Sequence, residues 1–495
     1  MAFTFDQLRQ TGLIRTDNLI DGHWIGGADG TRFAVTDPAT GSIIAKVPDS
    51  SAADARAATD AAARAFPAWR DTLPAERAAI LRRWHAAIVA NADALGRLIS
   101  LEQGKPFAEG RGEVLYGASY VAWFADEATR IYGDLIPQQQ RGKRMSAVKE
   151  PVGVVAAITP WNFPLAMIAR KIAPALAAGC TVVAKPAEDT PLTALALAQL
   201  AQEAGLPPGV LNMISASRER GVAAVADWLQ DARVRKITFT GSTPVGKYLA
   251  RESAGTLKKL SLELGGNAPF IVFDDAYVDA AVEGAMIAKF RNAGQTCVCA
   301  NRFYVQRGIY DTFAAKLTDA VRALRVGNGT EPGVQQGPLI HLRAMDKVRA
   351  HVDDAIAQGG RVLVGGKPHA LSAQGGAFFE PTVIADATPG MQVAHEETFG
   401  PLAALIPFDT EDEAVAAAND TEFGLAAYFY TRDLGRAWRV SEALESGMVG
   451  VNTGLISTAE APFGGVKQSG LGREGSKYGI DEYLEIKYVA MAGLG

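Results

Sequence analysis

Cysteine is scarce in this sequence: 495 residues contain only three, Cys180, Cys297 and Cys299. Three cysteines cannot build a disulfide framework, and an odd number suits a reducing compartment. Zinc needs three or four ligands, whereas Cys297 and Cys299 are separated by one residue and have no histidine close by in the sequence. We therefore expect no metal site.

Long apolar runs and concentrated positive charge are missing as well. The longest uncharged apolar run, 172–184, is well short of the roughly 20 residues that cross a bilayer. The formal net charge is -5, so the chain lacks the positive charge that binding to DNA or to an anionic membrane requires. The first residues lack the apolar core of a secretion signal. These absences predict a cytoplasmic protein that binds neither nucleic acid nor membranes.

Two blocks of alternating short apolar runs and helical segments follow an alanine-rich helical region at 51–106. One block begins at residue 152, with an amphipathic helix expected at 165–178, and the other runs from about Phe270 to Asn452. Such alternation predicts parallel α/β sheets with helices on both faces and a nucleotide site at the carboxyl ends of the strands. The segments 129–149 and 484–492 lie outside both blocks and could pair as an extra β-element for self-association.

The stretch FTGSTPVGKY, 239–248, nearly matches a phosphate-binding P-loop. Tyr248 replaces the small hydroxyl that would reach Mg²⁺ and Pro244 removes a backbone donor, so an NTPase is disfavoured. The position still suits a pyrophosphate at a helix N-terminus, although a helix cap without any ligand would have the same sequence.

Lys185 and Glu188 follow the expected strand CTVVAK. An acidic side chain there can accept both ribose hydroxyls of an adenosine and would repel a 2'-phosphate, which favours NAD over NADP. A charged loop that caps a helix at Asp189 or Thr190 is the alternative.

Cys297 follows a polar, glycine-containing loop, a setting that suits a nucleophile, whereas Cys180 within a strand suits a buried structural role. A Cys297–Cys299 disulfide would be strained and easily reduced, so Cys299 is a candidate redox switch. Glu263 precedes two glycines that permit close approach and is a candidate general base. The Asn162 amide could donate to a developing oxyanion. Each residue could also belong to an ordinary loop.

Seven motifs together resemble the aldehyde dehydrogenase superfamily, in its order and over most of the chain: PWNFP (160–164), KPAE (185–188), FTGSTPVG (239–246), ELGG (263–266), GQTC (294–297), EETFGP (396–401) and PFGGVKQSG (462–470). The runs around Cys297 and the last motif resemble succinate-semialdehyde dehydrogenases in particular. The resemblance implies an α/β aldehyde dehydrogenase-like fold with a Rossmann-type NAD-binding domain (1–128 and 150–263), an α/β catalytic domain (264–470) and a small β oligomerisation element (129–149 and 471–495).

The same resemblance implies a role for each matching residue. Cys297 attacks an aldehyde, Asn162 and the Cys297 amide hold the oxyanion, and Glu263 activates the water that hydrolyses the thioester. The implied ligands of NAD, with NADP as the alternative, are Trp161, Lys185, Glu188, Gly241, Ser242, Gly246, Leu264, Glu397 and Phe399.

Arg170 and Arg291 flank these motifs and are expected to face the tunnel that leads to Cys297, where two guanidiniums suit the far carboxylate of a small semialdehyde. The resemblance adds Ser457 and Phe463 and implies succinate semialdehyde, with glutarate semialdehyde or another short-chain aldehyde as alternatives, in a homodimer or homotetramer. A CoA-acylating enzyme and a non-catalytic thiol sensor are the rival interpretations.

Overall fold

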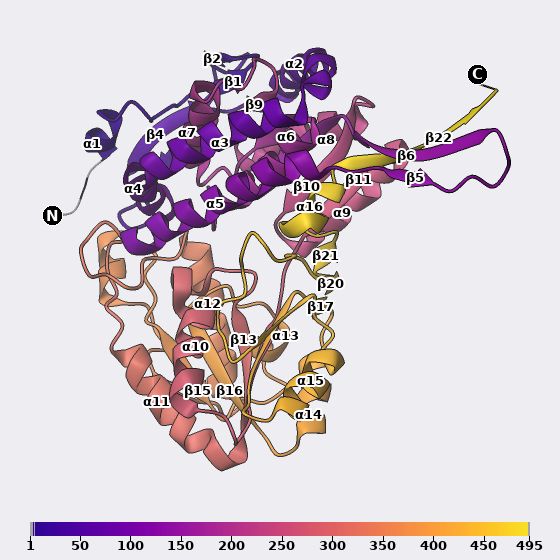
Figure 1. Cartoon of the computed structure of the whole chain (residues 1–495). Coiled ribbons are helices and arrows are strands. Elements are labelled where there is room, and N and C mark those ends of the chain that lie inside the picture. Colours follow the sequence, from indigo (N-terminus) through magenta and orange to yellow (C-terminus); the bar gives the residue numbers. More distant parts are fainter. Residues whose placement is uncertain (1–2, 4, 494–495) are drawn as a thin grey trace.

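The computed structural model describes residue 3 and residues 5–493. Two sheets with their helices form two bodies, one above the other in Figure 1, and a β-arm projects from the upper body. No helix in the described part of the chain has the length and apolarity needed to span a bilayer.

The upper sheet has eight strands in the order β2-β1-β9-β8-β7-β10-β11-β21, of which β9 to β11 are parallel. The chain leaves β7 towards β8 on one side, and β10 lies on the other side, so the strand order reverses between β7 and β10. Ligands of open α/β sheets bind beyond the carboxyl ends of strands at such a reversal. The strands are β1 (Asn18–Ile20), β2 (His23–Ile25), β7 (Val154–Ile158), β8 (Thr181–Lys185), β9 (Leu211–Met213), β10 (Val234–Thr240), β11 (Lys259–Glu263) and β21 (Gly470–Leu471).

Alternate residues of β7 face opposite layers of helices. Val155 and Ala157 belong to the apolar cluster with α3 to α7, whereas Val154 and Ala156 pack with α2 and α8. We expected an amphipathic helix at 165–178, but all 13 residues of α6 are buried, because α6 lies between the sheet and α5. The helices of this body are α1 (Phe5–Arg9), α2 (Ala52–Asp71), α3 (Pro74–Ala90), α4 (Ala92–Gln103), α5 (Phe107–Glu127), α6 (Ala166–Ala178), α7 (Pro191–Glu203), α8 (Arg218–Gln230), α9 (Thr243–Ser253) and α16 (Ser476–Asp481).

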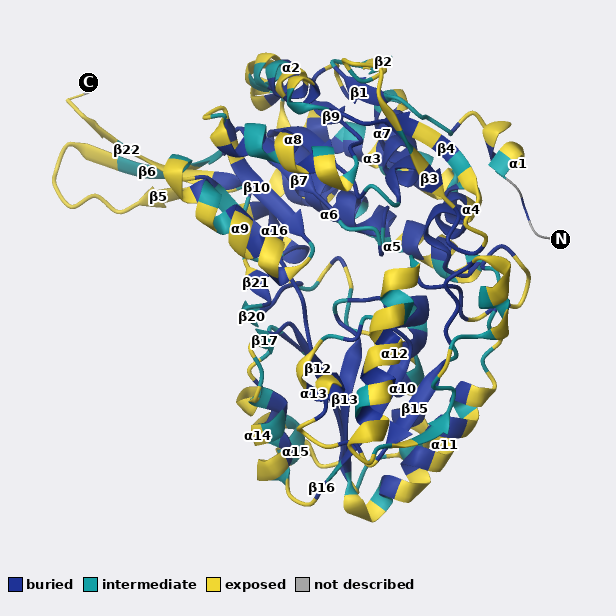
Figure 2. Ribbon diagram, turned by 180° about the vertical axis from the view of Figure 1, so that it is seen from behind, coloured by how far each residue is buried: buried dark blue, intermediate teal, exposed yellow. Residues whose placement is uncertain are grey.

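The lower sheet has seven strands in the order β14-β15-β16-β13-β12-β18-β19, all parallel except β14. Figure 2 shows its strands buried beneath helices whose outer faces are exposed. The strands are β12 (Ala268–Val272), β13 (Ala300–Gln306), β14 (Arg361–Val364), β15 (Thr382–Ala385), β16 (Leu402–Phe408), β18 (Ala426–Tyr430) and β19 (Met448–Val451). The helices are α10 (Val278–Phe290), α11 (Tyr310–Arg322), α12 (Leu342–Ala357), α13 (Gln392–His395), α14 (Glu411–Asn419) and α15 (Leu434–Ala443).

The arm confirms the expected pairing of the segment before β7 with the C-terminal segment. Strand β6 (Lys143–Pro151) pairs with β22 (Leu484–Ala492) on one side and β5 (Asp134–Ile136) on the other, in antiparallel fashion. Its limits differ from those expected, because residues 128–130 form a short 3-10 helix and α16 packs on α5 and α6 of the upper body. A small hairpin, β3 (Arg32–Thr36) with β4 (Ile43–Pro48), and an antiparallel pair from distant segments, β17 (Phe423–Gly424) with β20 (Val466–Lys467), complete the fold.

Candidate active site

The loop that carries Cys297 lies at the amino end of β13 and has an unusual backbone. Asn292, Ala293 and Gly294 have φ values of 53°, 53° and 74°, a left-handed path that is costly for alanine. A side chain at Gly294 would meet the carbonyl oxygen of Gly400 at 2.1 Å, so this position requires glycine. The Cys297 thiol at the end of the loop is free and half-buried. Loss of hydration raises its pKa to about 12, against the opposing effect of the Arg170 charge.

Asn162 lies beside this loop. Its side-chain nitrogen donates a hydrogen bond of 3.0 Å to the carbonyl of Gln295, two residues before Cys297, and its side-chain oxygen is buried without a partner. The amide that we expected to serve an oxyanion is therefore at the Cys297 loop, and its Nδ2 atom rests on a backbone oxygen of that loop.

Glu263 ends β11 and is 1% exposed. Neither carboxylate oxygen has a hydrogen-bond partner, and desolvation followed by the nearby Glu474 charge raises its pKa well above the ordinary value for a glutamate. The glycine that we expected to permit close approach does so: a Cβ at Gly266 would be 2.5 Å from the carbonyl oxygen of Cys297. The Cys297 loop therefore meets the segment after β11, where the chain passes from the upper sheet to the lower sheet.

Arg170 has an ion-pair partner that the sequence did not indicate, and its role towards a substrate stays a prediction. Its side chain is completely buried and forms an ion pair with Glu474, which also binds Lys171. The Phe463 ring lies 4.1 Å from the guanidinium carbon. The site therefore does not present two unpaired guanidiniums, because Glu474 already balances charge at Arg170.

Arg291 has different surroundings. It forms no ion pair within the described residues, its Nε atom is buried without a hydrogen-bond partner, and its guanidinium lies 5.5 Å from the Phe163 ring. Ser457 is half-buried in the loop before β20, on the segment whose Thr458 carbonyl accepts a hydrogen bond of 3.4 Å from Tyr120. Arg291 is thus the available cation of the predicted substrate pair.

The upper sheet offers unsatisfied polar groups where a dinucleotide would lie. The hydroxyls of Thr159, just after β7, and Thr240, at the end of β10, are buried without partners at the reversal of strand order. Ser242 precedes the first residue of α9, and its side chain makes no capping hydrogen bond. A Cβ at Gly246 would be 2.4 Å from the end of the Leu264 side chain, so this helix packs closely against the residue after β11.

The remaining predicted cofactor residues gather around the same ends of the strands. The Lys185 ammonium nitrogen and a Glu188 carboxylate oxygen are 3.5 Å apart. The rings of Trp161 and Phe399 meet edge to face, with centroids 5.6 Å apart. Glu397 accepts a hydrogen bond of 3.2 Å from the Gly266 amide, and burial raises its pKa to about 7. The set of donors and acceptors fits a dinucleotide.

Cys299 is buried, and its thiol donates to the carbonyl of Lys289 at 3.4 Å. Its role as a redox partner of Cys297 stays a prediction. Cys180 is buried against the Tyr483 carbonyl at 3.4 Å, and burial raises its pKa to about 11, in keeping with the structural role that we expected. No cluster of three or more His, Cys, Asp or Glu side chains suited to a metal occurs in residues 3 and 5–493.

The profile of the aldehyde dehydrogenase family matches residues 24–489. The chain belongs to this family. It is 58% identical to a 3-sulfolactaldehyde dehydrogenase of Pseudomonas putida, with 99% of each chain covered. It is 56% identical to a glutarate-semialdehyde dehydrogenase of Pseudomonas aeruginosa, over 99% of this chain and 100% of the relative.

The crystal structure of a succinate-semialdehyde dehydrogenase from Burkholderia pseudomallei superposes with a TM-score of 0.95 at 56% identity, over 97% of this chain and 99% of that one. The expected fold class is therefore confirmed. As an aldehyde dehydrogenase, the protein is an oxidoreductase that uses NAD or NADP.

Sequence analysis missed three buried charged residues of this aldehyde dehydrogenase site: Glu474, Lys105 and Glu113. Glu474 holds Arg170 and Lys171, whereas Lys105 and Glu113 pair with each other at 2.6 Å behind Asn162. One signal was present, because Arg170 and Lys171 directly precede the longest apolar run and a buried cation needs a partner. Nothing local indicated that the partner of these two cations lies 303 residues beyond Lys171.

Proposed function

We propose that the protein oxidises succinate semialdehyde to succinate, through a thiohemiacetal and then a thioester on Cys297. The observation that carries the chemistry is the close approach of Gly266 to the Cys297 carbonyl, which joins the thiol loop to a strand that ends in an unpartnered carboxyl group at Glu263. A nucleophile and a base at one point are the minimum that acyl transfer to water requires.

Proton movements follow from the two pKa values. The Cys297 thiol, with a pKa of about 12, is protonated at rest, so attack on a carbonyl must release a proton to a base. The raised pKa of Glu263 makes its carboxylate a stronger base than an ordinary glutamate. After this proton has been released to solvent, the Glu263 carboxylate serves again by taking a proton from the water that attacks the thioester, giving a carboxylic acid and regenerating the thiol.

The Asn162 amide stabilises the oxyanion of both tetrahedral species, with the Cys297 backbone N–H as the second donor. In the resting enzyme one of the two N–H groups on its nitrogen donates to the Gln295 carbonyl at 3.0 Å, which leaves the other for a substrate oxygen. A bound dinucleotide supplies the hydride acceptor.

The dinucleotide would be held by Ser242 and the first turn of α9 at its pyrophosphate, by Lys185 and Glu188 at the adenosine ribose, and by Glu397 at the other ribose. The Glu188 carboxylate repels a 2'-phosphate, so NAD is the preferred cofactor. Trp161 and Phe399 enclose the nicotinamide end.

Substrate choice depends on the tail of the aldehyde. Arg291 is a cation with no ion-pair partner in the described chain, and a short aldehyde with an anionic tail would supply one. Succinate semialdehyde is the main candidate, and glutarate semialdehyde, one methylene longer, is the alternative, since a methylene is worth only about 1 to 3 kcal/mol in a pocket. The 3-sulfolactaldehyde of one relative has an anionic tail of a third kind.

A comparison of kcat/KM for succinate semialdehyde, glutarate semialdehyde, 3-sulfolactaldehyde and uncharged butanal, each with NAD and with NADP, tests this proposal. We expect succinate semialdehyde with NAD to be the best pair and butanal the poorest. Arg291→Met should reduce kcat/KM for the anionic aldehydes by about 10- to 100-fold, the loss of one charge-assisted hydrogen bond, and leave butanal unchanged. Equal losses for all four aldehydes would refute the anion site, and acyl transfer to added CoA would favour the CoA-acylating alternative.

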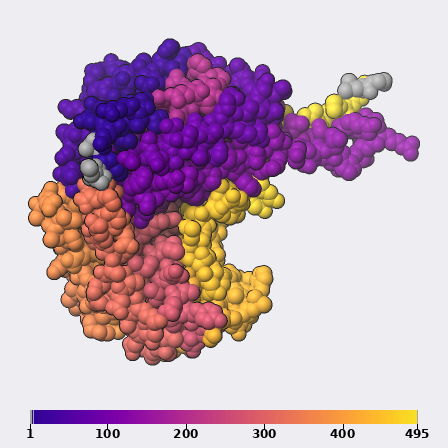
Figure 3. Space-filling model, turned by 60° about the vertical axis from the view of Figure 1, so that its left-hand side comes forward, coloured from indigo at the N-terminus to yellow at the C-terminus, as the bar shows by residue number. Residues whose placement is uncertain are grey.

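The arm supports a further proposal, a homodimer or homotetramer. Figure 3 shows that the arm projects from the body. Its apolar side chains Leu135, Ile486 and Tyr488 are 91%, 74% and 59% exposed, which is unusual for a monomer surface. Light scattering separates monomer, dimer and tetramer. We also propose a cytoplasmic enzyme, since its thiol chemistry needs a reducing compartment; fractionation of cells tests this.

A further inference from the structure

We propose that Lys105 and Glu113 together position the Asn162 amide for catalysis. The proposal rests on the roles proposed above for Cys297 and Asn162. Neither residue belongs to the motifs that identify the family, and neither touches the reacting atoms. Both act through the loop that joins β7 to α6.

The two side chains form a buried ion pair. Lys105 lies just after α4 and Glu113 lies in α5, and their charged atoms are 2.6 Å apart with 1% of each side chain exposed. A buried pair of this kind contributes little net stability compared with apolar side chains, because both charges lose their hydration. Its value must therefore be sought in what the pair holds in place.

The pair holds the Asn162 loop at two points, at Asn162 itself and at the start of α6. The Lys105 ammonium donates to the Asn162 carbonyl at 2.8 Å and lies 4.0 Å from the centre of the Phe163 ring. The second oxygen of Glu113 accepts the backbone N–H groups of Leu165 and Ala166, at 2.8 and 3.3 Å. These amides open α6, where helix geometry leaves N–H groups without partners and favours a negative charge.

The carbonyl that Lys105 holds is also joined to the Cys297 loop. It accepts a second hydrogen bond, of 3.0 Å, from the side chain of Asn292. The same Asn292 nitrogen and the Asn162 side chain both donate to the Gln295 carbonyl, at 3.2 and 3.0 Å. The Asn162 carbonyl thus accepts hydrogen bonds from both Lys105 and Asn292, and these two bonds fix the Asn162 backbone relative to the Cys297 loop.

The corner between α4 and α5 fixes Asn292 as well. Gln103 donates to the Asn292 side-chain oxygen at 2.9 Å, and Glu109 accepts the Asn292 backbone N–H at 2.8 Å. Residues 103–113 therefore hold both the nucleophile loop and the oxyanion loop. Lys105 is the cation at this corner that reaches the oxyanion loop directly.

An oxyanion donor works only at the correct position. Removing such a donor costs about 10²- to 10³-fold in rate, and displacing it costs part of that factor. Loss of Lys105 should therefore slow those reactions of the Cys297 thiol that pass through an oxyanion and spare those that do not.

Two thiol reagents make this distinction without a dinucleotide. Acylation by 4-nitrophenyl acetate passes through a tetrahedral oxyanion, whereas alkylation by iodoacetamide displaces iodide and forms none. For Lys105→Met we expect acylation of Cys297 to slow by about 10- to 100-fold, and alkylation, with the labelled residue identified by mass spectrometry, to change by less than about threefold.

Lys258→Met is the matched control. The ammonium of Lys258 is also buried and binds two backbone carbonyls, those of Asp231 and Val234, each at 2.7 Å, but these lie outside the Asn162 loop. We expect its ratio of acylation to alkylation to equal that of the parent enzyme. If Lys105→Met does not fold, the double variant Lys105→Met, Glu113→Gln removes both charges, leaves an oxygen for the Leu165 amide, and should show the same lowered ratio.

The result that overturns the inference is a ratio in the Lys105 variants equal to the parent ratio, whether both rates are normal or both fall together. Failure of the proposed function looks different. In that case Cys297→Ala would keep its aldehyde dehydrogenase activity, and alkylation of Cys297 would leave the parent enzyme active.

Discussion

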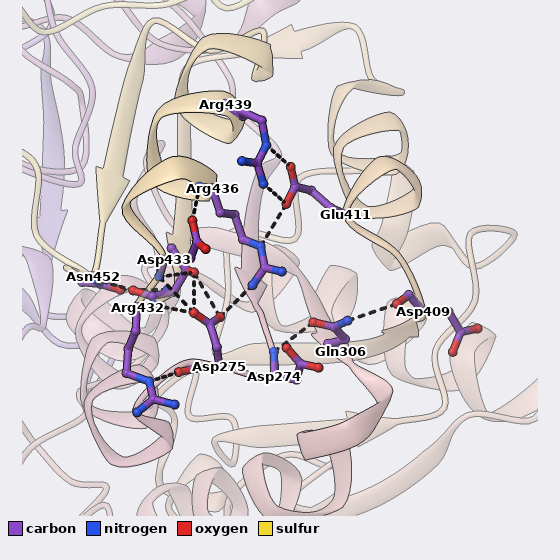
Figure 4. A network of polar contacts seen from close by, with 11 residues as sticks. Asp274, Asp275, Gln306, Asp409, Glu411, Arg432, Asp433, Arg436, Arg439 and Asn452 are labelled. Atoms are coloured by element: carbon purple, nitrogen blue, oxygen red, sulfur yellow. Dashed lines mark hydrogen bonds and ion pairs between the residues drawn. The ribbon is translucent and has the colours of Figure 1, made fainter.

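Two clusters in this enzyme join basic side chains to carboxylates, but one cluster is buried and the other is partly exposed to solvent. Behind the active site, Arg170, Lys171 and Glu474 are 0%, 0% and 3% exposed. On the lower body, Arg436 and Glu411 are 21% and 23% exposed and join a wider network that includes Asp275 and Arg439 (Figure 4).

This network, the more exposed of the two, holds helices in place. Asp275, just beyond β12, accepts the backbone N–H groups of Arg432 and Asp433 at the start of α15 and pairs with Arg436 at 2.8 Å. Glu411 at the start of α14 receives both Arg436 and Arg439 from α15. Water competes for these contacts, so each contributes little to stability.

The buried cluster acts on the two groups that we propose to react, Cys297 and Glu263. Charges in a low-dielectric interior influence one another over longer distances than charges at a surface. Arg170 opposes the rise in the pKa of Cys297, and Glu474 contributes to the rise in the pKa of Glu263. Burial, and not the kind of residue, therefore decides whether an ion cluster tunes chemistry or fastens helices.

The largest effect should come from breaking the buried cluster. Glu474→Ala leaves Arg170 and Lys171 as two buried cations without a carboxylate, because both pair with Glu474. Loss of one partner from a buried pair costs about 3 to 5 kcal/mol in the free energy of unfolding. Denaturant titration of the purified variant measures this loss.

Glu411→Ala is the control for that experiment, because Glu411 also pairs with two cations. A loss in Glu474→Ala no greater than that in Glu411→Ala would show that burial does not separate the two clusters.

The sequence predicted the polar loops of the site better than the charges behind them. Cys297, Glu263 and Asn162 could be proposed because each lies beside glycine or proline residues whose geometry is local. A close approach at the glycines after Glu263 was expected for the same reason, but not that the approaching group is the Cys297 carbonyl. Both sheets followed from the alternation of strands and helices. The pairing of the C-terminal segment with the segment before β7 was proposed because both lie outside the two alternating blocks, whereas the order of the strands was not predicted.

The partners of buried charges could not be predicted in this way. Glu474 lies in a glycine-rich, polar segment that looks exposed in the sequence, yet it is 3% exposed. Arg170 was assigned to the substrate because its helical spacing places it near the tunnel, and spacing says nothing of a carboxylate from another part of the chain. The Lys105 and Glu113 pair is likewise joined only when α4, α5 and the Asn162 loop pack together.

The second effect should appear in the pH dependence of catalysis. Glu263, the proposed base, can accept a proton only when it is ionised, and desolvation with the Glu474 charge raises its pKa. The rate of thioester hydrolysis should therefore rise with pH through that raised pKa. Glu263→Gln should lose this rise and reduce kcat by about 10²- to 10⁴-fold. Steady-state rates of the parent and of Glu263→Gln from pH 5 to 9 measure the rise and the loss of kcat.

Two variants sharpen the comparison between the clusters. Glu474→Gln removes the charge that helps to raise the pKa of Glu263, so the rise should move to lower pH. Glu411→Gln, in the exposed network, should leave the rise where it is. A Glu263→Gln enzyme that keeps the rise would assign it to another group.

The smallest effect should come from the exposed network. Hydrogen bonds from Arg439, against a slight opposing effect of burial, lower the pKa of Glu411. A carboxylate with a lowered pKa stabilises the fold above its unfolded pKa, and this contribution is lost as the pH falls through the lowered value. Glu411→Gln should therefore cost about 1 kcal/mol or less at pH 7 and nothing in acid.

The deficit should also shrink in 1 M salt, where charges are screened beyond about 3 Å, whereas the deficit of Glu474→Ala should persist because its partners exclude solvent ions. Chemical denaturation of both variants at two pH values and two salt concentrations measures these losses in the free energy of unfolding. A Glu411→Gln deficit that salt does not reduce would show that this network behaves like the buried cluster.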